Sequence, residues 1–340
     1  MEALWFCLVA IMITGYVILD GYDLGAGVVQ LLGTRTREER AQILKSIGPF
    51  WDGNEVWLLA GGGTLYFAFP GLYASSFSGF YLPLMMVLWL LMLRGISIEL
   101  RNHIDSPVWH PFWDVVFGIS STLLAVFYGA ALGNVVRGVP LDKNGVFFLP
   151  LWTHWGVRGD VGILDWYTVL TGVLALSALA MHGALWVYFK TTGELQTRAR
   201  SLAVRGTIIT AFLTVVVSLI TFSIQPKIPA SFATRPWGVI FPAIAIGGIA
   251  SIFLSLRQGK EARAFLSSCI FLLGMMTSVV FGVFPMVLPS NLDPGLSLTI
   301  YNTAAASYGL RVGLMWWIPG MILAGVYSTF LHRRFAGKVS

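Results

Sequence analysis

Long apolar stretches separated by shorter polar segments dominate the chain. A helix that crosses a lipid bilayer needs about 20 predominantly apolar residues, and nine stretches meet this length. They cover roughly residues 3–32, 49–69, 74–95, 112–135, 163–189, 206–225, 238–256, 265–288 and 312–331. The pattern predicts an all-α polytopic membrane protein with about nine transmembrane helices.

Composition favours the same class. The chain has 340 residues, of which 56% are hydrophobic and 11% are charged, whereas soluble proteins carry about 25% charged residues. The mean hydropathy is +0.75. We therefore expect a single integral membrane domain over residues 1–340 and no soluble domain. The first apolar stretch lacks a basic n-region and a small-residue cleavage site, so we expect it to be a membrane helix instead of a cleaved signal peptide.

The distribution of basic residues predicts the orientation. The last stretch ends in His332-Arg333-Arg334, and positively charged segments favour the cytoplasmic side. We therefore expect a cytoplasmic C-terminus and, with nine spans, an N-terminus outside. Sixteen of the 22 lysines and arginines then lie in cytoplasmic segments and six lie outside. This bias accounts for the net charge of +6 without a nucleic-acid partner.

Polar and small residues follow one face of the first predicted helix. A spacing of three to four residues aligns Tyr16, Asp20, Asp23, Gly27 and Gln30. Ionisable residues within a membrane span are costly and by default indicate function. We expect Asp20 to be buried in the protein. For Asp23 and Gln30, the alternative is a solvated position at the membrane surface.

A second pair of acids, Asp52 and Glu55, opens the second predicted span between Trp51 and Trp57. Carboxylates near a helix N-terminus are stabilised by the helix dipole by about 0.3–1 kcal/mol, so both acids have a purely structural interpretation. The functional interpretation is a protonatable group that accepts and releases protons near the cytoplasmic face. A short connector joins the first two predicted helices, so we expect the four acids to meet on one side of the bilayer.

The end of the third predicted span carries Arg94, Glu99 and Arg101. Glu99 can pair with Arg94, with Arg101 or with a charge on a partner. The simplest account is a salt-bridged helix end whose long side chains reach toward water. We therefore expect these three residues to be structural or to lie at a subunit interface.

The sequence offers little support for a metal or haem site. Of the five histidines, only His182 lies inside a predicted span, and no second His or Met shares a matching face. Cys7 and Cys269 lie in apolar stretches without metal-ligand or disulfide spacing, so we expect packing roles and no metal site. No P-loop, catalytic triad or Cys-x-x-Cys motif occurs.

The residues alone thus predict a nine-helix protein with a cytoplasmic acidic cluster. They leave three alternatives open. The chain is a proton-handling subunit of a larger complex, a secondary transporter, or a structural subunit whose acids neutralise arginines of a partner.

Several motifs resemble those of subunit II of the cytochrome bd-type quinol oxidases, including the cyanide-insensitive branch. The most specific is Trp51-Asp-Gly-Asn-Glu-Val-Trp57. The others occur in the family's order: Asp20-Gly-Tyr-Asp-Leu-Gly-Ala-Gly27, Phe77-Ser-Gly-Phe-Tyr81, Gly133-Asn134 with Gly138-Val-Pro140, Gly193-Glu-Leu195 and Phe284-Pro-Met-Val-Leu-Pro-Ser290. The resemblance covers essentially the whole chain.

The resemblance implies an enzyme complex that oxidises quinol and reduces dioxygen to water with protons from the cytoplasm. In that family, subunit I carries the b-type and d-type haems and the quinol-oxidation loop, whereas subunit II carries no haem ligand. The implied fold is two four-helix bundles plus one peripheral helix, packed against subunit I as a heterodimer in the bacterial inner membrane. The implied partners are subunit I, quinol and lipids, with a small single-helix accessory subunit as a further candidate.

The resemblance also implies roles for the two acidic motifs. Asp52, with the tryptophan before it, would lie on a proton path from the cytoplasm to the haem d site, and Trp57 would border a hydrophobic oxygen route. Asp20 and Asp23 would act at the subunit interface or in the proton path. Two departures affect these implications. Phe50 replaces a His that the family often has there, which removes a candidate proton donor at the mouth of the path. The connector after the sixth span is short, which weakens the expectation of a bound quinone or lipid on this subunit.

Overall fold

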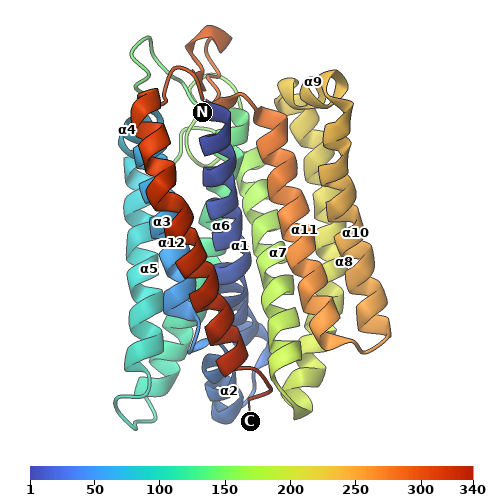
Figure 1. Ribbon diagram of the computed structural model, residues 1–340. Coiled ribbons are helices and arrows are strands. Elements are labelled where there is room, and N and C mark those ends of the chain that lie inside the picture. Colours follow the sequence, from blue (N-terminus) through green and yellow to red (C-terminus); the bar gives the residue numbers. More distant parts are fainter. Residues whose placement is uncertain (340) are drawn as a thin grey trace.

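The computed structural model describes residues 1–339, which form an all-α protein with one small two-stranded sheet (Figure 1). The long helices run side by side, and the two ends of the chain lie at opposite ends of the bundle. The elements in order are α1 (Glu2–Gly33), α2 (Arg37–Ile47), α3 (Trp51–Ala68), α4 (Pro70–Gly79), α5 (Tyr81–Leu100), α6 (Trp109–Arg137), α7 (Trp166–Lys190), α8 (Gly193–Ile224), α9 (Lys227–Thr234), η1 (Pro236–Val239), α10 (Ile240–Arg257), α11 (Glu261–Val283), β1 (Met286–Leu288), η2 (Pro294–Leu296), β2 (Leu298–Thr299) and α12 (Ser307–Arg334).

Eight helical segments of the described chain are long and apolar enough to cross a membrane, namely α1, α5, α6, α7, α8, Pro236–Arg257, α11 and α12. Each overlaps one predicted span. The ninth prediction, 49–69, corresponds to α3, an 18-residue helix whose first two turns carry Asp52, Asn54 and Glu55. At 1.5 Å per residue α3 is about 27 Å long, close to the hydrocarbon thickness of about 30 Å. Its polar first two turns therefore need protein or water around them.

The predicted span 74–95 begins too early, because the structure has two helices there. α4 ends at Gly79, and α5 begins at Tyr81 and continues to Leu100. Pro83 lacks the N–H group that would donate to the carbonyl of Gly79. That carbonyl instead accepts the N–H of Leu149, at 3.2 Å, so the chain changes direction between α4 and α5.

Two other predicted boundaries also differ from the structure. The span 265–288 is too long, because α11 ends at Val283, and Pro285 disfavours helical geometry in the residue before it. The residues that follow form β1, which pairs antiparallel with β2. The span 206–225 is too short, because α8 begins at Gly193 and its charged first turns precede the apolar stretch.

Two groups of four helices form the body of the protein, in agreement with the arrangement that the resemblance implies. One group is α1, α3, α5 and α6, and the other is α7, α8, α10 and α11. They meet where α1 and α6 pack against α7. A Cβ atom at Gly25 of α1 would lie 2.0 Å from the carbonyl oxygen of Leu179 in α7. The close approach of these two helices therefore requires glycine.

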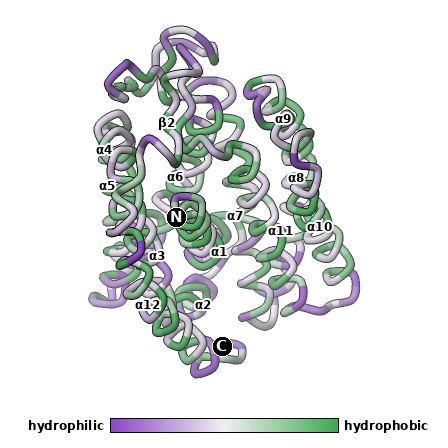
Figure 2. The backbone as a smooth tube through the Cα atoms, turned by 45° about the horizontal axis from the view of Figure 1, so that its top comes forward, coloured by the Kyte–Doolittle hydropathy of each residue, from purple (hydrophilic) through white to green (hydrophobic). Residues whose placement is uncertain are grey.

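α12 is the peripheral helix. It lies along the outside of the first group, where its Gly313 approaches Phe67 of α3 and Trp5 of α1. None of the residues in its most apolar window is buried. The outer helices are largely hydrophobic along their length, and hydrophilic stretches gather toward the ends of the bundle (Figure 2).

The sequence pattern does not predict α2, because this helix is short and charged. Thr36 and Glu39 cap its N-terminus reciprocally, as in a capping box. Its apolar residues Ile43, Leu44 and Ile47 are buried against the rest of the protein. α2 lies at the same end of the bundle as the C-terminus (Figure 1).

The C-terminal tail binds this end of the bundle. Lys190 of α7 donates a hydrogen bond to the carbonyl of Phe335 at 2.7 Å, and Gln42 of α2 donates to the carbonyl of Val339 at 2.7 Å. Phe50, which precedes α3, packs against His332 of α12 with 4.8 Å between ring centroids. The tail thus holds the last turn of α12 near the start of α3.

Candidate functional site

A buried arginine gathers three of the predicted acids. Arg94 of α5 is 0% exposed. Its guanidinium donates hydrogen bonds to Asp20 of α1 and to Glu55 of α3, the latter at 2.9 Å. It also lies 3.8 Å from a carboxylate oxygen of Asp23. We call these four residues the Arg94 cluster, and it joins α1, α3 and α5.

The Arg94 cluster contains more acid than base. One guanidinium faces three carboxylates, so two negative charges are in excess when all three acids are ionised. Removing such charges from water costs several kcal/mol each, and a bound proton lowers that cost. Asp20 Oδ2 and Asp23 Oδ1 are buried and have no hydrogen-bond partner within residues 1–339. The arrangement can therefore hold an exchangeable proton.

Asn54 extends the cluster to a tyrosine. Its side-chain amide donates to Asp23 Oδ2 at 2.8 Å and to the hydroxyl of Tyr22 at 2.7 Å, and Asn54 itself is buried. The sequence did not single out this residue, although it lies between Asp52 and Glu55 in the most specific motif. A polar residue on the inward face of a membrane helix is the signal that points to it.

The two acids of α3 have different surroundings. The Glu55 side chain is 25% exposed and connects the buried Arg94 to the protein surface. Asp52 is exposed and does not join the Arg94 cluster. Three residues correspond to about 4.5 Å along a helix axis, so Asp52 lies about one turn closer to the end of α3. The four acids share one side of the protein, as predicted, but only three of them form one ion cluster.

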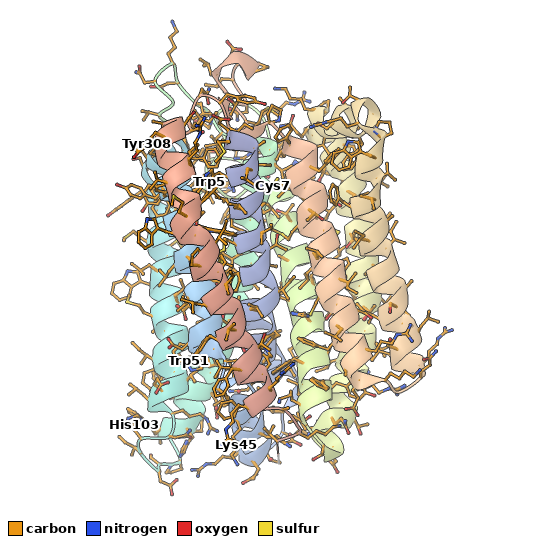
Figure 3. All side chains as sticks on the ribbon, in the orientation of Figure 1. Trp5, Cys7, Lys45, Trp51, His103 and Tyr308 are labelled. Carbon is orange, nitrogen blue, oxygen red and sulfur yellow. The ribbon has the colours of Figure 1, made fainter. Side chains whose placement is uncertain are left out.

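The two tryptophans of the motif lie on either side of Glu55 along α3. The Trp51 ring centroid is 5.7 Å from the guanidinium carbon of Arg94, and Figure 3 places Trp51 in the same half of the bundle as Lys45 and the C-terminal end. The Trp57 ring packs against α1, where a Cβ atom at Gly15 would lie 2.9 Å from it. Trp51 therefore covers part of the Arg94 cluster, whereas Trp57 packs between α3 and α1.

A second buried ion cluster lies nearer the end of α1. Arg101 makes two hydrogen bonds to the carboxylate of Asp114, at 2.6 and 3.2 Å. Gln30 donates to the same carboxylate at 3.0 Å, and Arg40 lies 3.8 Å from it. Gln30 and Asp23 are thus buried, and the solvated alternative is wrong for both. The sequence did not single out Asp114, although an acid inside the predicted span 112–135 was a visible signal.

Glu99 pairs with neither Arg94 nor Arg101. Arg94 and Arg101 bind other acids, and Glu99 is exposed on α5. Five residues separate Glu99 from Arg94 and two separate it from Arg101, so it lies about 140° and 160° away from them around the helix. The expected pairing of Glu99 with Arg94 or with Arg101 is therefore wrong.

His182 does not fit a haem ligand. It is buried, its Nδ1 lies 2.7 Å from Ser268 Oγ, and its Nε2 lies 2.9 Å from the carbonyl oxygen of Ile18. An axial haem ligand needs a free ring nitrogen, and both are engaged here. Among the described residues, no group of three or more His, Cys, Asp or Glu side chains could hold a metal ion.

The sequence matches a known family along nearly its whole length. Residues 1–335 match cytochrome bd terminal oxidase subunit II. The probable cytochrome oxidase subunit 2 of Haemophilus influenzae is 30% identical over 364 residues, which cover 99% of this chain and 94% of the relative. The cytochrome bd ubiquinol oxidase subunit 2 of Bacillus subtilis is 30% identical over 338 residues, which cover 97% of this chain and 95% of the relative.

The fold also matches a solved structure. A chain of the bd oxidase from Geobacillus thermodenitrificans superposes with a TM-score of 0.77, over 98% of this chain and 98% of that chain. The two sequences are 17% identical, so this likeness concerns the fold alone.

Proposed function

We propose that this chain stabilises the haem-bearing subunit I and contributes a proton path and an oxygen route to that subunit. The chain belongs to the cytochrome bd terminal oxidase subunit II family, and this membership is the basis of the proposal. Family membership makes the chain a multi-pass inner-membrane subunit of a haem-containing quinol oxidase with a subunit I partner. In our proposal, haems b and d and the quinol site belong to subunit I. The engaged ring nitrogens of His182 support a haem-free role for this chain.

We propose that subunit I covers the face formed by α3, α5 and α12, which we call the partner face. α12 has no buried residue in its most apolar window. On α3, Asp52 is exposed, and a Cβ atom at Gly62 or Gly63 would meet open space. An exposed carboxylate and bare glycines on a membrane helix fit a protein neighbour better than lipid tails. Glu99 of α5 is also exposed and available to a charge on the partner.

The observation that carries the proton path is a line of carboxylates from the surface of α3 to the protein interior. Asp52 is exposed, Glu55 is partly exposed and bonded to Arg94, and Asp20 lies on the other side of the same guanidinium. In the proposed path, Asp52 takes a proton from water and passes it toward Glu55. Arginine does not lose its proton in proteins, so Arg94 holds the carboxylates in position while the proton moves among the acids and bound water.

The proposed orientation makes this path electrogenic. The bias of Lys and Arg supports a cytoplasmic C-terminal end, and Trp51 lies in the half of the bundle that carries this end (Figure 3). Protons consumed at the haem d site then come from the cytoplasm, whereas protons from quinol leave on the other side. A membrane potential follows without a proton pump.

The oxygen route remains a proposal that rests on Trp57. Its ring lies between α3 and α1 against Gly15, and the neighbouring residues of α3 are apolar or small. An apolar seam of this kind suits a small uncharged molecule such as dioxygen.

The experiment that tests the proposed function is oxygen consumption by the complex with Asp52→Asn. We expect quinol-driven turnover to fall at least about tenfold, since positioned acid–base groups typically contribute 10²-fold or more, while the haems still assemble. Asp105→Asn is the matched control, because Asp105 is also an exposed acid, in the connector between α5 and α6. Wild-type turnover in a fully assembled Asp52→Asn complex would refute the relay.

A further inference from the structure

A groove of about 540 Å³ opens between α9 and the segment that follows α11. It lies at the end of the bundle that carries the N-terminus (Figure 1). Its walls include Lys227 and Arg235 on one side and Met286, Ser297 and Thr299 on the other. The proposed function uses none of these residues.

The groove carries two cations without an acidic partner. Lys227 Nζ lies 3.3 Å from the sulfur of Met286, and a thioether is only a weak acceptor. The guanidinium carbon of Arg235 lies 4.9 Å and 5.0 Å from the ring centroids of Phe281 and Phe284. Within residues 1–339, neither cation forms an ion pair with a carboxylate, and no Asp or Glu lines the groove. The groove therefore has a net charge of about +2.

Two hydroxyl groups in the groove have a proton left to donate. Ser297 Oγ accepts the N–H of Ser290 at 3.0 Å. Thr299 Oγ1 accepts the N–H groups of Tyr301 and Asn302 at 3.3 Å each. A hydroxyl that accepts from the backbone still has its own proton to donate. Two cations and two hydroxyl donors around an open groove form a receptor for an oxyanion.

The depth of the groove in the membrane points to a lipid. Trp237, three residues after the end of α9, is 64% exposed and packs edge-on against Phe281 with 4.9 Å between ring centroids. Exposed tryptophans of membrane proteins gather at the level of the lipid headgroups. The phosphodiester of a phospholipid lies at that level, and Val239 at the end of η1 and Ile240 at the start of α10 are exposed beside it.

We propose that this groove binds the phosphate of an anionic phospholipid, with phosphatidylglycerol as the representative headgroup. Lys227 and Arg235 contact the phosphate, Ser297 and Thr299 donate hydrogen bonds to it, and the acyl chains lie along the apolar surface of the helices. The site is separate from the proton path, so either proposal can fail without the other.

The test is lipid binding to the delipidated, purified complex, counted by native mass spectrometry during titration with phosphatidylglycerol. A basic residue at an anionic lipid surface contributes roughly fivefold in affinity. We therefore expect Lys227→Gln/Arg235→Gln to weaken the tightest phosphatidylglycerol site by about 25-fold. Lys143→Gln/Arg158→Gln removes two exposed charges from the connector between α6 and α7, and this control should bind like the wild type.

Three outcomes would overturn the proposal. The first is equal binding of phosphatidylglycerol by the wild type and Lys227→Gln/Arg235→Gln. The second is binding of phosphatidylcholine to the wild type as tightly as phosphatidylglycerol. The third is full displacement of the lipid by millimolar inorganic phosphate, which would indicate a site for the free anion. Because Arg235 also packs on two phenylalanines, Lys227→Gln alone is the second variant, with an expected loss of about fivefold. An unchanged haem spectrum verifies that each complex is assembled.

Discussion

Arg94→Met removes the only cation of the Arg94 cluster and keeps a side chain of similar length. Arg94 is fully buried, and its guanidinium contacts Asp20, Asp23 and Glu55. Loss of one partner of a buried ion pair typically destabilises a protein by about 3–5 kcal/mol, because the other charge is left without compensation. Here three carboxylates are left, so we expect a loss in this range and a ratio of folded to unfolded protein that is lower by roughly 10²–10⁴-fold.

The assay is unfolding of the purified complex in mixed micelles of increasing SDS content, followed by tryptophan fluorescence. Arg257→Met is the matched control, since Arg257 is exposed at the end of α10 and such surface changes usually stay within about 0.5 kcal/mol. The double variant Arg94→Met/Asp20→Asn removes one of the stranded charges. We expect it to be more stable than the sum of the two single changes by about 2 kcal/mol, within the range for residues in one network.

Two results would refute this reasoning. An Arg94→Met complex as stable as Arg257→Met would mean that the buried ion cluster does not hold α1, α3 and α5 together. Strict additivity in the double variant would mean that Arg94 and Asp20 do not interact energetically.

Three further predictions concern other contacts. Asp114→Asn leaves the buried guanidinium of Arg101 without its carboxylate, so we expect a loss of about 3 kcal/mol in the same SDS titration; an unchanged midpoint would contradict the buried pair. Gly183→Ala places a methyl group 2.0 Å from the backbone of α1, so we expect the yield of assembled complex, measured by its haem absorbance, to fall several-fold, and a wild-type yield would argue against so close a helix contact. The Arg37 guanidinium holds the pKa of the Asp105 carboxyl below its ordinary value of 3.8. A pKa that is lower in the folded state stabilises the fold at pH values above the unfolded-state pKa, and this stabilisation is lost as the pH falls through the folded-state pKa. The thermal midpoints of wild type and Asp105→Asn should therefore differ by a constant amount above about pH 5 and converge below pH 3.8. Midpoints that diverge on acidification would show the opposite linkage.

Helical periodicity was sufficient to predict the inward face of α1. Tyr16, Asp20, Asp23, Gly27 and Gln30 recur every three to four residues, and all five are buried. The apolar stretches were likewise sufficient to locate the long helices. Hydropathy alone predicted one continuous span across the break between α4 and α5, although Pro83 marks the missing hydrogen bond there. It also missed α2, because a charged surface helix has no apolar stretch.

Contacts between helices could not be predicted from the sequence. Arg94 bonds to Asp20, 74 residues away, and to Glu55, 39 residues away, because of how α1, α3 and α5 pack. For the same reason, the sequence offered Glu99 as a partner of the arginines beside it, whereas the helix turns them to different sides. The different surroundings of Asp52 and Glu55 likewise appear only when α5 is placed beside α3.

Proton uptake during a single turnover tests the proton path most directly. Fully reduced wild-type and Asp52→Asn complexes, matched for haem d content, are mixed with dioxygen in weakly buffered solution that contains a pH-indicator dye. We expect the Asp52→Asn complex to take up protons at least about tenfold more slowly, while oxygen binding to the reduced haem is unchanged. Equal rates of proton uptake would contradict the path and leave Asp52 as a surface residue of the partner face.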